Sequence, residues 1–263
     1  MTVGLVIIDP QNCFMDLPGA PLPVKGATAD MEHLSVFITS NYRHIDEVQV
    51  SFDTHPFDHI SHTNRWIDRD GNHPAPFTII TSEAYERGDW LAAKSTDQWW
   101  QGQYLKLLKR PHCIWPIHGQ ESEWEWQMHD GLRRAVFLLI DRCMSYRKGR
   151  HRDTEQFGIF GADVPFPGAP ETEINMELIE QINRHDCIIF AGEASSHCVM
   201  DSVNQFIAHT PDRDHKKIVV LRDCMSPVPQ APGGPDFPKL AADWLTSLQS
   251  IDVNVITSTE LTL

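Results

Sequence analysis

Residues 185–206 read HDCIIFAGEASSHCVMDSVNQF and contain a strand followed by a helix. Cys187–Ala191 is an apolar run that predicts a buried parallel strand, and the run ends at Gly192. A helical pattern follows, with two serines as candidate caps and Cys198 in the first turn. Because free N–H groups and the helix dipole favour a thiolate there, we expect a lowered pKa for Cys198. The stretch fits a nucleophilic cysteine at a strand–helix turn and, equally, a buried helical cysteine.

Alternating strand and helix patterns extend over most of the chain. The other apolar runs predict strands at Val3–Ile8, Val48–Phe52, Val136–Ile140, Ile218–Leu221 and Val253–Ile256. Helical periodicity predicts helices at Thr28–Tyr42, Ser122–Arg134, Ile174–Arg184, Ser196–His209 and Lys239–Leu248. Most of the strand runs are continuous, as in strands covered on both faces, whereas residues 48–52 alternate and are expected nearer an edge. The order predicts a doubly wound, three-layer α/β/α fold with a mostly parallel sheet.

Residues 63–109 interrupt this alternation. The segment contains turn signals and several tryptophans, so it is too long for an ordinary connection and too aromatic for a disordered linker. We expect an ordered insertion, acting as a lid or a subunit contact, within a single domain that spans residues 1–263. Proline and glycine residues at 226–235 predict a second, shorter loop.

Composition excludes several classes of protein. The formal net charge of the 263 residues is −14, which argues against binding to nucleic acid or to an anionic membrane surface. No run of 18 apolar residues occurs and no basic segment precedes Val3–Ile8, so we expect neither a membrane span nor a secretory signal. The six cysteines are scattered without a Cys-x-x-Cys pair, which predicts free thiols in a reducing, cytoplasmic compartment.

Charged residues lie where a doubly wound sheet places its ligand crevice, beyond the carboxyl ends of the strands. Asp9 closes the run Val3–Ile8; it is either a turn residue or a proton acceptor whose pKa is raised by desolvation. Lys148 follows the third predicted strand and is either a solvated loop lysine or a cation that steadies a carboxylate and a thiolate. His197 is not the base for Cys198, because adjacent helical residues point about 100° apart.

Asp53 and His55 suggest a metal site at the end of the predicted strand Val48–Phe52. Residues i and i+2 of an extended segment project to the same side, so these two side chains can hold one ion. Further histidines follow at His59, His62, His112 and His118. Aspartate with several histidines suits Zn²⁺, Fe²⁺ or Mn²⁺ better than Mg²⁺ or Ca²⁺. The alternative is a histidine-rich polar loop.

Several short motifs occur together in one order: Ile7–Asn12 (IIDPQN), Asp53–Pro56 (DTHP) with His59–Ser61, Trp115–His118 (WPIH), Lys148–Gly149, Ala191–Val199 (AGEASSHCV) and Val219–Cys224 (VVLRDC). In these motifs the chain resembles the isochorismatase-like cysteine hydrolases, and within them the nicotinamidases, over residues 1–62 and 110–230. It departs from the common pattern at Cys13, where an acidic residue is usual, and at Gly119, where a cysteine is frequent. The 63–109 insertion resembles that of a longer nicotinamidase-like subgroup.

The resemblance implies a role for each matching residue. The catalytic triad would be Asp9, Lys148 and Cys198, and the backbone N–H groups of Ala194 and Cys198 would form the oxyanion hole after a cis peptide bond at Glu193–Ala194. The metal ligands would be Asp53, His55 and His118, with His59 as a candidate fourth, and His118 is preferred over His112 because it follows the Trp-Pro-x pattern. Phe14 and Trp115 would line the substrate pocket. One divalent transition metal (Zn, Fe or Mn) and no organic cofactor are implied.

The resulting hypothesis is an amidohydrolase that cleaves a small carboxamide, with nicotinamide as the leading substrate and a cysteine thioester as the intermediate. We expect a homo-oligomer that takes a small-molecule amide and binds neither nucleic acid nor membrane. The nearest alternative is a metal-free carbamoyl or ureido amidase on the same fold. A vinyl-ether hydrolase of the isochorismatase type would have no need of Cys198. A non-catalytic binding protein is less consistent with Asp9, Lys148 and Cys198 occurring together.

Overall fold

The computed structural model describes residues 1–230 and 235–263, so part of the predicted second loop, residues 231–234, lies outside it. Its central strands are β1 Val3–Ile8, β2 Glu47–Asp53, β7 Cys143–Lys148, β8 Cys187–Gly192, β9 Ile218–Leu221 and β10 Asn254–Ile256. They form one sheet in the order β10-β9-β8-β1-β2-β7, and every neighbouring pair is parallel. The predicted doubly wound α/β fold is confirmed.

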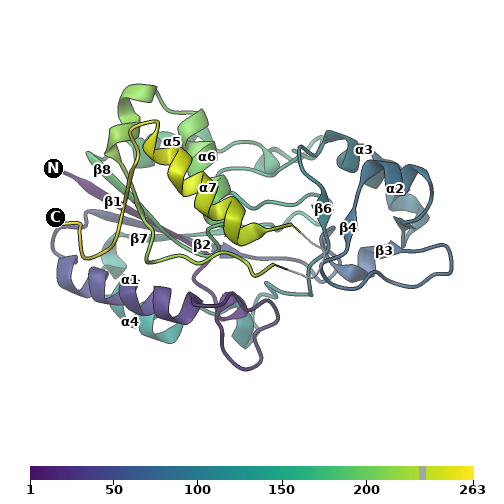
Figure 1. Ribbon diagram of the computed structural model, residues 1–263, viewed down its shortest axis with the longest axis horizontal. Helices are drawn as coiled ribbons and strands as arrows, with labels where there is room; N and C mark the ends of the chain where they lie inside the picture. The colour runs from purple at the N-terminus through teal and green to yellow at the C-terminus, as the bar shows by residue number, and fades with distance from the viewer. Residues whose placement is uncertain (231–234) are drawn as a thin grey trace.

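Helices cover both faces of this sheet (Figure 1). α1 Ala27–Asn41 and α4 Asp130–Phe137 lie on one face, and α5 Met176–Asn183, α6 Cys198–Ala208 and α7 Phe237–Gln249 lie on the other. Strand β1 is buried on both sides because Leu5 and Ile7 pack toward α1 while Val6 and Ile8 pack toward α6. Among the described residues, no helix combines the length and apolar character that crossing a membrane requires.

The prediction of a strand at Val136–Ile140 is wrong. Val136 and Phe137 end helix α4, whose buried face includes Leu132 and Val136, while Phe137 and Ile140 are exposed. The predicted helix at 122–134 correspondingly begins only at Asp130. The third strand is instead β7, whose residues CMSYRK give little apolar signal because β7 is one of the two edge strands of this sheet and is half exposed. Strand β2, which was expected nearer an edge, is the neighbour of β7.

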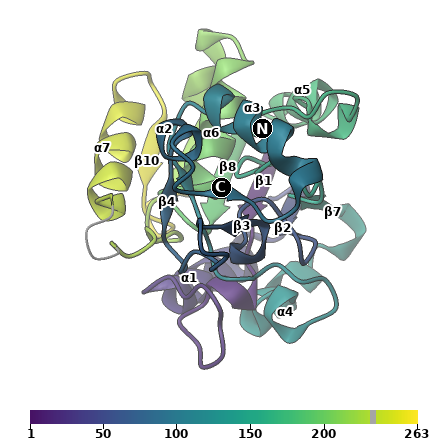
Figure 2. The ribbon, with the colours of Figure 1, turned by 90° about the vertical axis from the view of Figure 1, so that its right-hand side faces the viewer.

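Residues 63–109 form most of a lobe beyond the carboxyl ends of the strands (Figures 1 and 2). Its elements are β3 Trp66–Ile67, β4 Ile79–Ile80, α2 Ser82–Glu86, β5 Leu91–Ala92 and α3 Gln98–Leu107, and β6 His112–Cys113 follows and pairs with β4. Trp66, Trp100 and Tyr104 are buried in one cluster with Val164. Trp99, by contrast, is 71 % exposed.

The lobe is attached to the loop that follows β7. Trp100 Nε1 donates a hydrogen bond to the carbonyl of Asp153 over 2.6 Å, and the guanidinium of Arg65 lies 2.6 Å from the Asp153 carboxylate. Arg65 is buried, so this ion pair is shielded from solvent. The lobe therefore supports the segment immediately after Lys148, beyond the carboxyl ends of the strands.

Candidate active site

The carboxyl ends of three strands and the start of one helix bring Asp9, Asp53, Lys148 and Cys198 together. Asp9 follows β1 directly, and Asp53 and Lys148 are paired in register as the last residues of β2 and β7. Cys198 is the first residue of α6. The two preceding serines do not cap this helix, since its N-cap residue is His197 and makes no side-chain cap hydrogen bond. The side chains of all four residues are buried.

The ammonium group of Lys148 lies at the centre of this group. Its Nζ is 2.9 Å from Asp9 Oδ2, 3.0 Å from Asp53 Oδ1 and 3.5 Å from Cys198 Sγ. It also donates to the carbonyl of Gln156. Burial alone would lower the pKa of Lys148, but Asp53 and Asp9 hold it well above its usual value, so the side chain stays charged. One buried cation thus links two carboxylates to the thiol.

Burial dominates the electrostatics of Asp9 and Cys198. It raises the pKa of Asp9 against the opposing effect of Lys148, and Ser51 Oγ donates to Asp9 Oδ1 over 2.6 Å. The expectation of a lowered pKa for Cys198 is wrong: burial raises the pKa of this thiol well above its usual value, although Lys148 acts to lower it. The resting cysteine is therefore a protonated thiol, and the neighbouring carboxyl group is one that readily accepts a proton.

The backbone before Cys198 is shaped by close contact with β1. The Glu193–Ala194 peptide bond is cis, as the resemblance implies. Gly192 has φ 117°, and a Cβ there would meet the Ile8 carbonyl oxygen at 2.0 Å, so only glycine fits. Within the described part of the chain, the N–H groups of Ala194 and Cys198 have no hydrogen-bond acceptor. Such free donors near a nucleophile are what an oxyanion hole requires.

Asp53, His55 and His118 converge in a way that suits a metal ion. Asp53 Oδ2 lies 3.0 Å from His55 Nε2 and 3.2 Å from His118 Nε2, and all three side chains are buried. The other ring nitrogens donate to the carbonyls of Gly149 and Pro116, over 2.9 and 2.8 Å. In the neutral rings these bonds leave each Nε2 as a lone-pair donor, the arrangement in which second-shell partners orient metal ligands. Burial opposes a charge on His55, yet Asp53 raises its pKa to about 9, so this carboxylate attracts positive charge.

The other predicted histidines play different parts. His59 stacks on His55 with ring centroids 4.0 Å apart, but both of its ring nitrogens are hydrogen-bonded, to Ser61 Oγ and to the Thr154 carbonyl. His112 lies in the lobe, where its Nε2 bonds the Ile60 carbonyl. His62 is buried beside His55 and His118, and within the described structure its Nε2 has no partner. It is a nearby free nitrogen that the sequence spacing did not single out.

A pocket of about 20 Å³ opens onto Cys198. Phe14 and Trp115 line it, together with Ala194, His55 and His118. Glu155, which sequence analysis missed, lines it as well, and its carboxylate lies within 4.8 Å of ring nitrogens of His55 and His59. Its only sequence signal is its position in the loop after Lys148. Burial lowers the pKa of His197 to about 3, and its Nδ1 bonds Ser196 Oγ, in agreement with its exclusion as the base.

No protein-family model and no curated protein sequence matches this chain. Solved structures do match, and they cover nearly all of it. The yeast nicotinamidase bound to nicotinaldehyde aligns with a TM-score of 0.68 and 18% identity, over 97% of this chain and 100% of that chain. The Acinetobacter baumannii nicotinamidase/pyrazinamidase gives 0.65 and 20%, over 99% and 98%. The Pyrococcus horikoshii pyrazinamidase in complex with zinc gives 0.57 and 16%, over 98% and 99%.

These likenesses establish the fold. The chain has the isochorismatase-like α/β fold, and the matching structures are nicotinamidases together with other isochorismatase-family proteins.

Proposed function

We propose that this protein is a cysteine-dependent amidase that hydrolyses a small primary carboxamide, with nicotinamide, converted to nicotinate and ammonia, as the first candidate. The observation that carries the proposal is the position of Lys148 Nζ between Asp9 Oδ2 and Cys198 Sγ, at 2.9 and 3.5 Å. A buried carboxylate, a buried lysine and a thiol at the start of a helix are the parts that acyl transfer through a thioester needs. The fold shared with nicotinamidases supports the same activity.

The chemistry follows from the two raised pKa values. Asp9 accepts the proton of the Cys198 thiol, while Lys148 steadies the thiolate that forms. The thiolate sulfur attacks the amide carbon, and the free N–H groups of Ala194 and Cys198 stabilise the oxyanion. Asp9 then donates its proton to the departing nitrogen, so that ammonia leaves and a thioester remains. Water hydrolyses the thioester, which releases the carboxylic acid and returns the proton to the thiol.

Asp53, His55 and His118 would hold one divalent transition metal, Zn²⁺, Fe²⁺ or Mn²⁺. When bound, such an ion would act as a Lewis acid toward a ring nitrogen or a water molecule. The chain's own residues orient its ligands, because Gly149 and Pro116 accept the second ring N–H of each histidine. A Cβ at Gly149 would lie 2.5 Å from the His55 ring, so glycine at this position keeps the ring in place.

Ammonia release tests the proposal directly. The purified enzyme should release ammonia from nicotinamide or pyrazinamide, and the Cys198→Ala variant should not. Cys224→Ala is a matched control, because Cys224 is also a buried cysteine but lies outside the pocket around Cys198. If Cys198→Ala keeps the turnover of the parent enzyme, the proposed mechanism is wrong.

Two alternatives predict different results in the same assay. A metal-free carbamoyl or ureido amidase would release ammonia from N-carbamoyl compounds and would contain no stoichiometric metal. The convergence of Asp53, His55 and His118 favours the metal-dependent form. A non-catalytic binding protein would release ammonia from none of these compounds, nor from maleamate, while still binding a small molecule in the pocket.

We further propose a cytoplasmic homo-oligomer. The six cysteines are free thiols, as expected in a reducing compartment. Exposed aromatic side chains, Trp99 on the lobe and Phe137 beside the edge strand, are suited to contacts between copies of the chain. Sedimentation analysis should show an assembly larger than a 30.0 kDa monomer. Trp99→Ser or Phe137→Ser should weaken that assembly, and a monomeric parent protein would contradict this proposal.

A further inference from the structure

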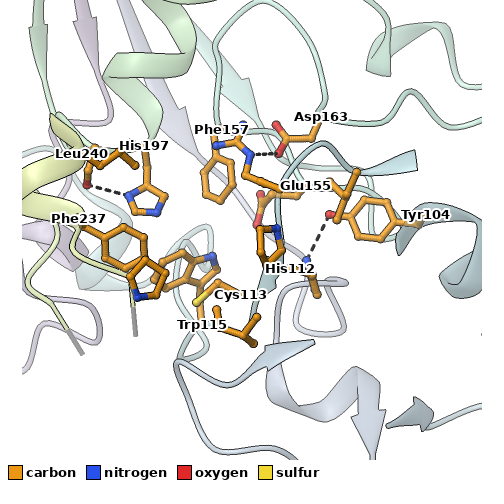
Figure 3. A pocket seen from close by; sticks show the side chains of 16 residues that line it. Tyr104, His112, Cys113, Trp115, Glu155, Phe157, Asp163, His197, Phe237 and Leu240 are labelled. Atoms are coloured by element: carbon orange, nitrogen blue, oxygen red, sulfur yellow. Dashed lines mark hydrogen bonds and ion pairs between the residues drawn. The ribbon is translucent and has the colours of Figure 1, made fainter. Parts of the chain in front are cut away.

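A second cavity, of about 170 Å³ (Figure 3), shares part of its lining with the pocket that opens onto Cys198. We call it the side cavity. Its walls come from the lobe, through Ile79 and Tyr104, and from the start of α7, through Phe237 and Leu240. The side chains that line both spaces are Trp115, Glu155, Phe157 and His197. Most of the free volume next to the nucleophile is therefore in the side cavity and not in the pocket of about 20 Å³.

The wall nearest to Cys198 is aromatic. The His197 ring lies between three others, with centroids 4.6 Å from Phe237, 5.2 Å from Trp115 and 5.3 Å from Phe157 (Figure 3). An apolar cavity of about 150 Å³ is large enough to hold a benzene ring. The size and the lining of the side cavity thus suit one apolar, ring-sized group.

The charges around the side cavity disfavour an anionic guest. The Arg110 guanidinium lies over the Phe157 ring, but its Nε is 3.2 Å from the Asp163 carboxylate and its terminal nitrogen pairs with Asp201. Its positive charge is therefore already matched. Two carboxylates share the single charge of Arg110, and Glu155 also lines the wall, so a carboxylate on the guest would meet an excess of negative charge and no unpaired cation among the described lining residues.

His197 offers one polar contact. Ser196 Oγ accepts a hydrogen bond from the Val228 N–H and lies 2.9 Å from His197 Nδ1. In the tautomer in which Ser196 Oγ donates to Nδ1, the ring proton of the neutral imidazole is on Nε2. That N–H has no acceptor among the described residues, so it can donate to a guest at the boundary between the two spaces.

The nitrogen side of the amide has no comparable room. In the proposed mechanism the leaving nitrogen faces Asp9, which is 0 % exposed, and Lys148, which is 2 % exposed. Neither residue is among those described as lining the pocket or the side cavity. A substituent on the amide nitrogen would have to displace buried, ion-paired side chains. An extension of the substrate must therefore be on its acyl side.

We propose that the preferred substrate is a primary carboxamide whose acyl part carries a second, uncharged, ring-sized apolar group, and that this group occupies the side cavity. The inference rests on the proposed amidase activity and specifies its substrate class. It makes the lobe a determinant of specificity, since Ile79 and Tyr104 form one wall of the side cavity.

Turnover of nicotinamide is compared with that of its 5- and 6-phenyl derivatives. The better phenyl isomer should show a kcat/KM at least about tenfold above that of nicotinamide, because an apolar group in a fitting pocket contributes at least this factor. Leu240→Trp, which fills the side cavity, should reduce the ratio of the two kcat/KM values to about one. Val36→Trp is the matched control, since Val36 is an exposed aliphatic residue on α1, and it should leave the ratio unchanged.

The possible failures are distinguishable. Turnover of nicotinamide without a gain for either phenyl isomer overturns the inference and leaves the amidase proposal standing. Release of benzylamine from N-benzylnicotinamide faster than ammonia from nicotinamide overturns the assignment to the acyl side. If no amide is hydrolysed, the amidase proposal fails. Calorimetric binding measurements on Cys198→Ala then test independently whether the side cavity holds an apolar ring. A phenyl derivative should bind at least about tenfold more tightly than nicotinamide, and equal Kd values would refute the side-cavity assignment.

Discussion

Replacing Lys148 with methionine removes the charge that holds the site together while keeping most of the side-chain volume. Lys148 Nζ lies 2.9 Å from Asp9 Oδ2 and 3.0 Å from Asp53 Oδ1, and all three side chains are buried. Loss of one partner from a buried ion pair costs about 3–5 kcal/mol, because the remaining charge is left uncompensated. At about 2–4 °C per kcal/mol for a chain of this size, Tm should fall by roughly 6–20 °C. Turnover should fall at least about a hundredfold, since Lys148 lowers the pKa of both Cys198 and Asp9.

The pH dependence of the loss in Tm gives a sharper test. The pKa of Asp9 is raised in the folded state, so the folded protein binds more protons than the unfolded one, and this contribution to stability is lost as pH rises through the folded pKa. Without Lys148 that pKa rises further. The difference in Tm between the parent protein and Lys148→Met should therefore be larger at about pH 8 than at about pH 5.

Thermal unfolding followed by circular dichroism measures both quantities. Lys217→Met is the control, because Lys217 pairs with Asp214 over 3.2 Å in a partly exposed position, and it should change stability by less than about 1 kcal/mol. A Lys148→Met variant that melts within about 2 °C of the parent protein, or one that is destabilised more at low pH, would refute the reasoning.

Three further predictions concern the proposed nucleophile, the proposed metal site and the loop before the proposed oxyanion hole. Cys198→Ala should keep the Tm of the parent protein and lose ammonia release by several orders of magnitude; retained turnover would show a different nucleophile. Elemental analysis of the purified protein should find about one transition metal ion per chain. The His118→Ala variant should lose this metal and the His112→Ala variant should keep it, and the reverse pattern would identify His112 as the ligand. Burial, then Asp30, raises the pKa of Glu193 well above its usual value, so its contribution to stability is lost as pH rises. Glu193→Gln, which resembles the protonated acid, should therefore flatten the fall of Tm between about pH 6 and about pH 9, and an unchanged slope would contradict this.

The parts of the fold that the sequence predicted are those buried on both faces. Strands β1 and β9 were predicted with their observed bounds, because parallel strands at the centre of a sheet are continuous apolar runs. Strand β7 was missed because it is an edge strand whose side chains are largely exposed, so its sequence is not a continuous apolar run. The apolar run at 136–140 misled the prediction, since Phe137 and Ile140 are apolar but exposed.

For the candidate site, the sequence indicated which residues meet but not how deeply they are buried. The helix-start argument for Cys198 is sound for a solvent-accessible thiol, but desolvation outweighs it here. The position of Glu155 and the side cavity depend on contacts between the lobe and the loop after Lys148. Those contacts join positions far apart in the chain, such as Trp100 and Asp153, and local sequence patterns do not predict them.

Asp9 and Asp53 both contact Lys148, and their different roles follow from the two histidines that contact Asp53 alone. Asp53 is buried, which alone would raise its pKa, but His55, Lys148 and His118 together hold its pKa well below the usual range. Asp9 is buried with only Lys148 and Ser51 to offset desolvation, so its pKa is raised. Two carboxylates whose pKa values are pushed apart take different roles: the low one stays ionised and can hold a cation, and the high one can carry a proton. Because Lys148 contacts both carboxylates and the thiol, each proton taken up by Asp9 leaves more of the lysine's charge to stabilise the thiolate of Cys198.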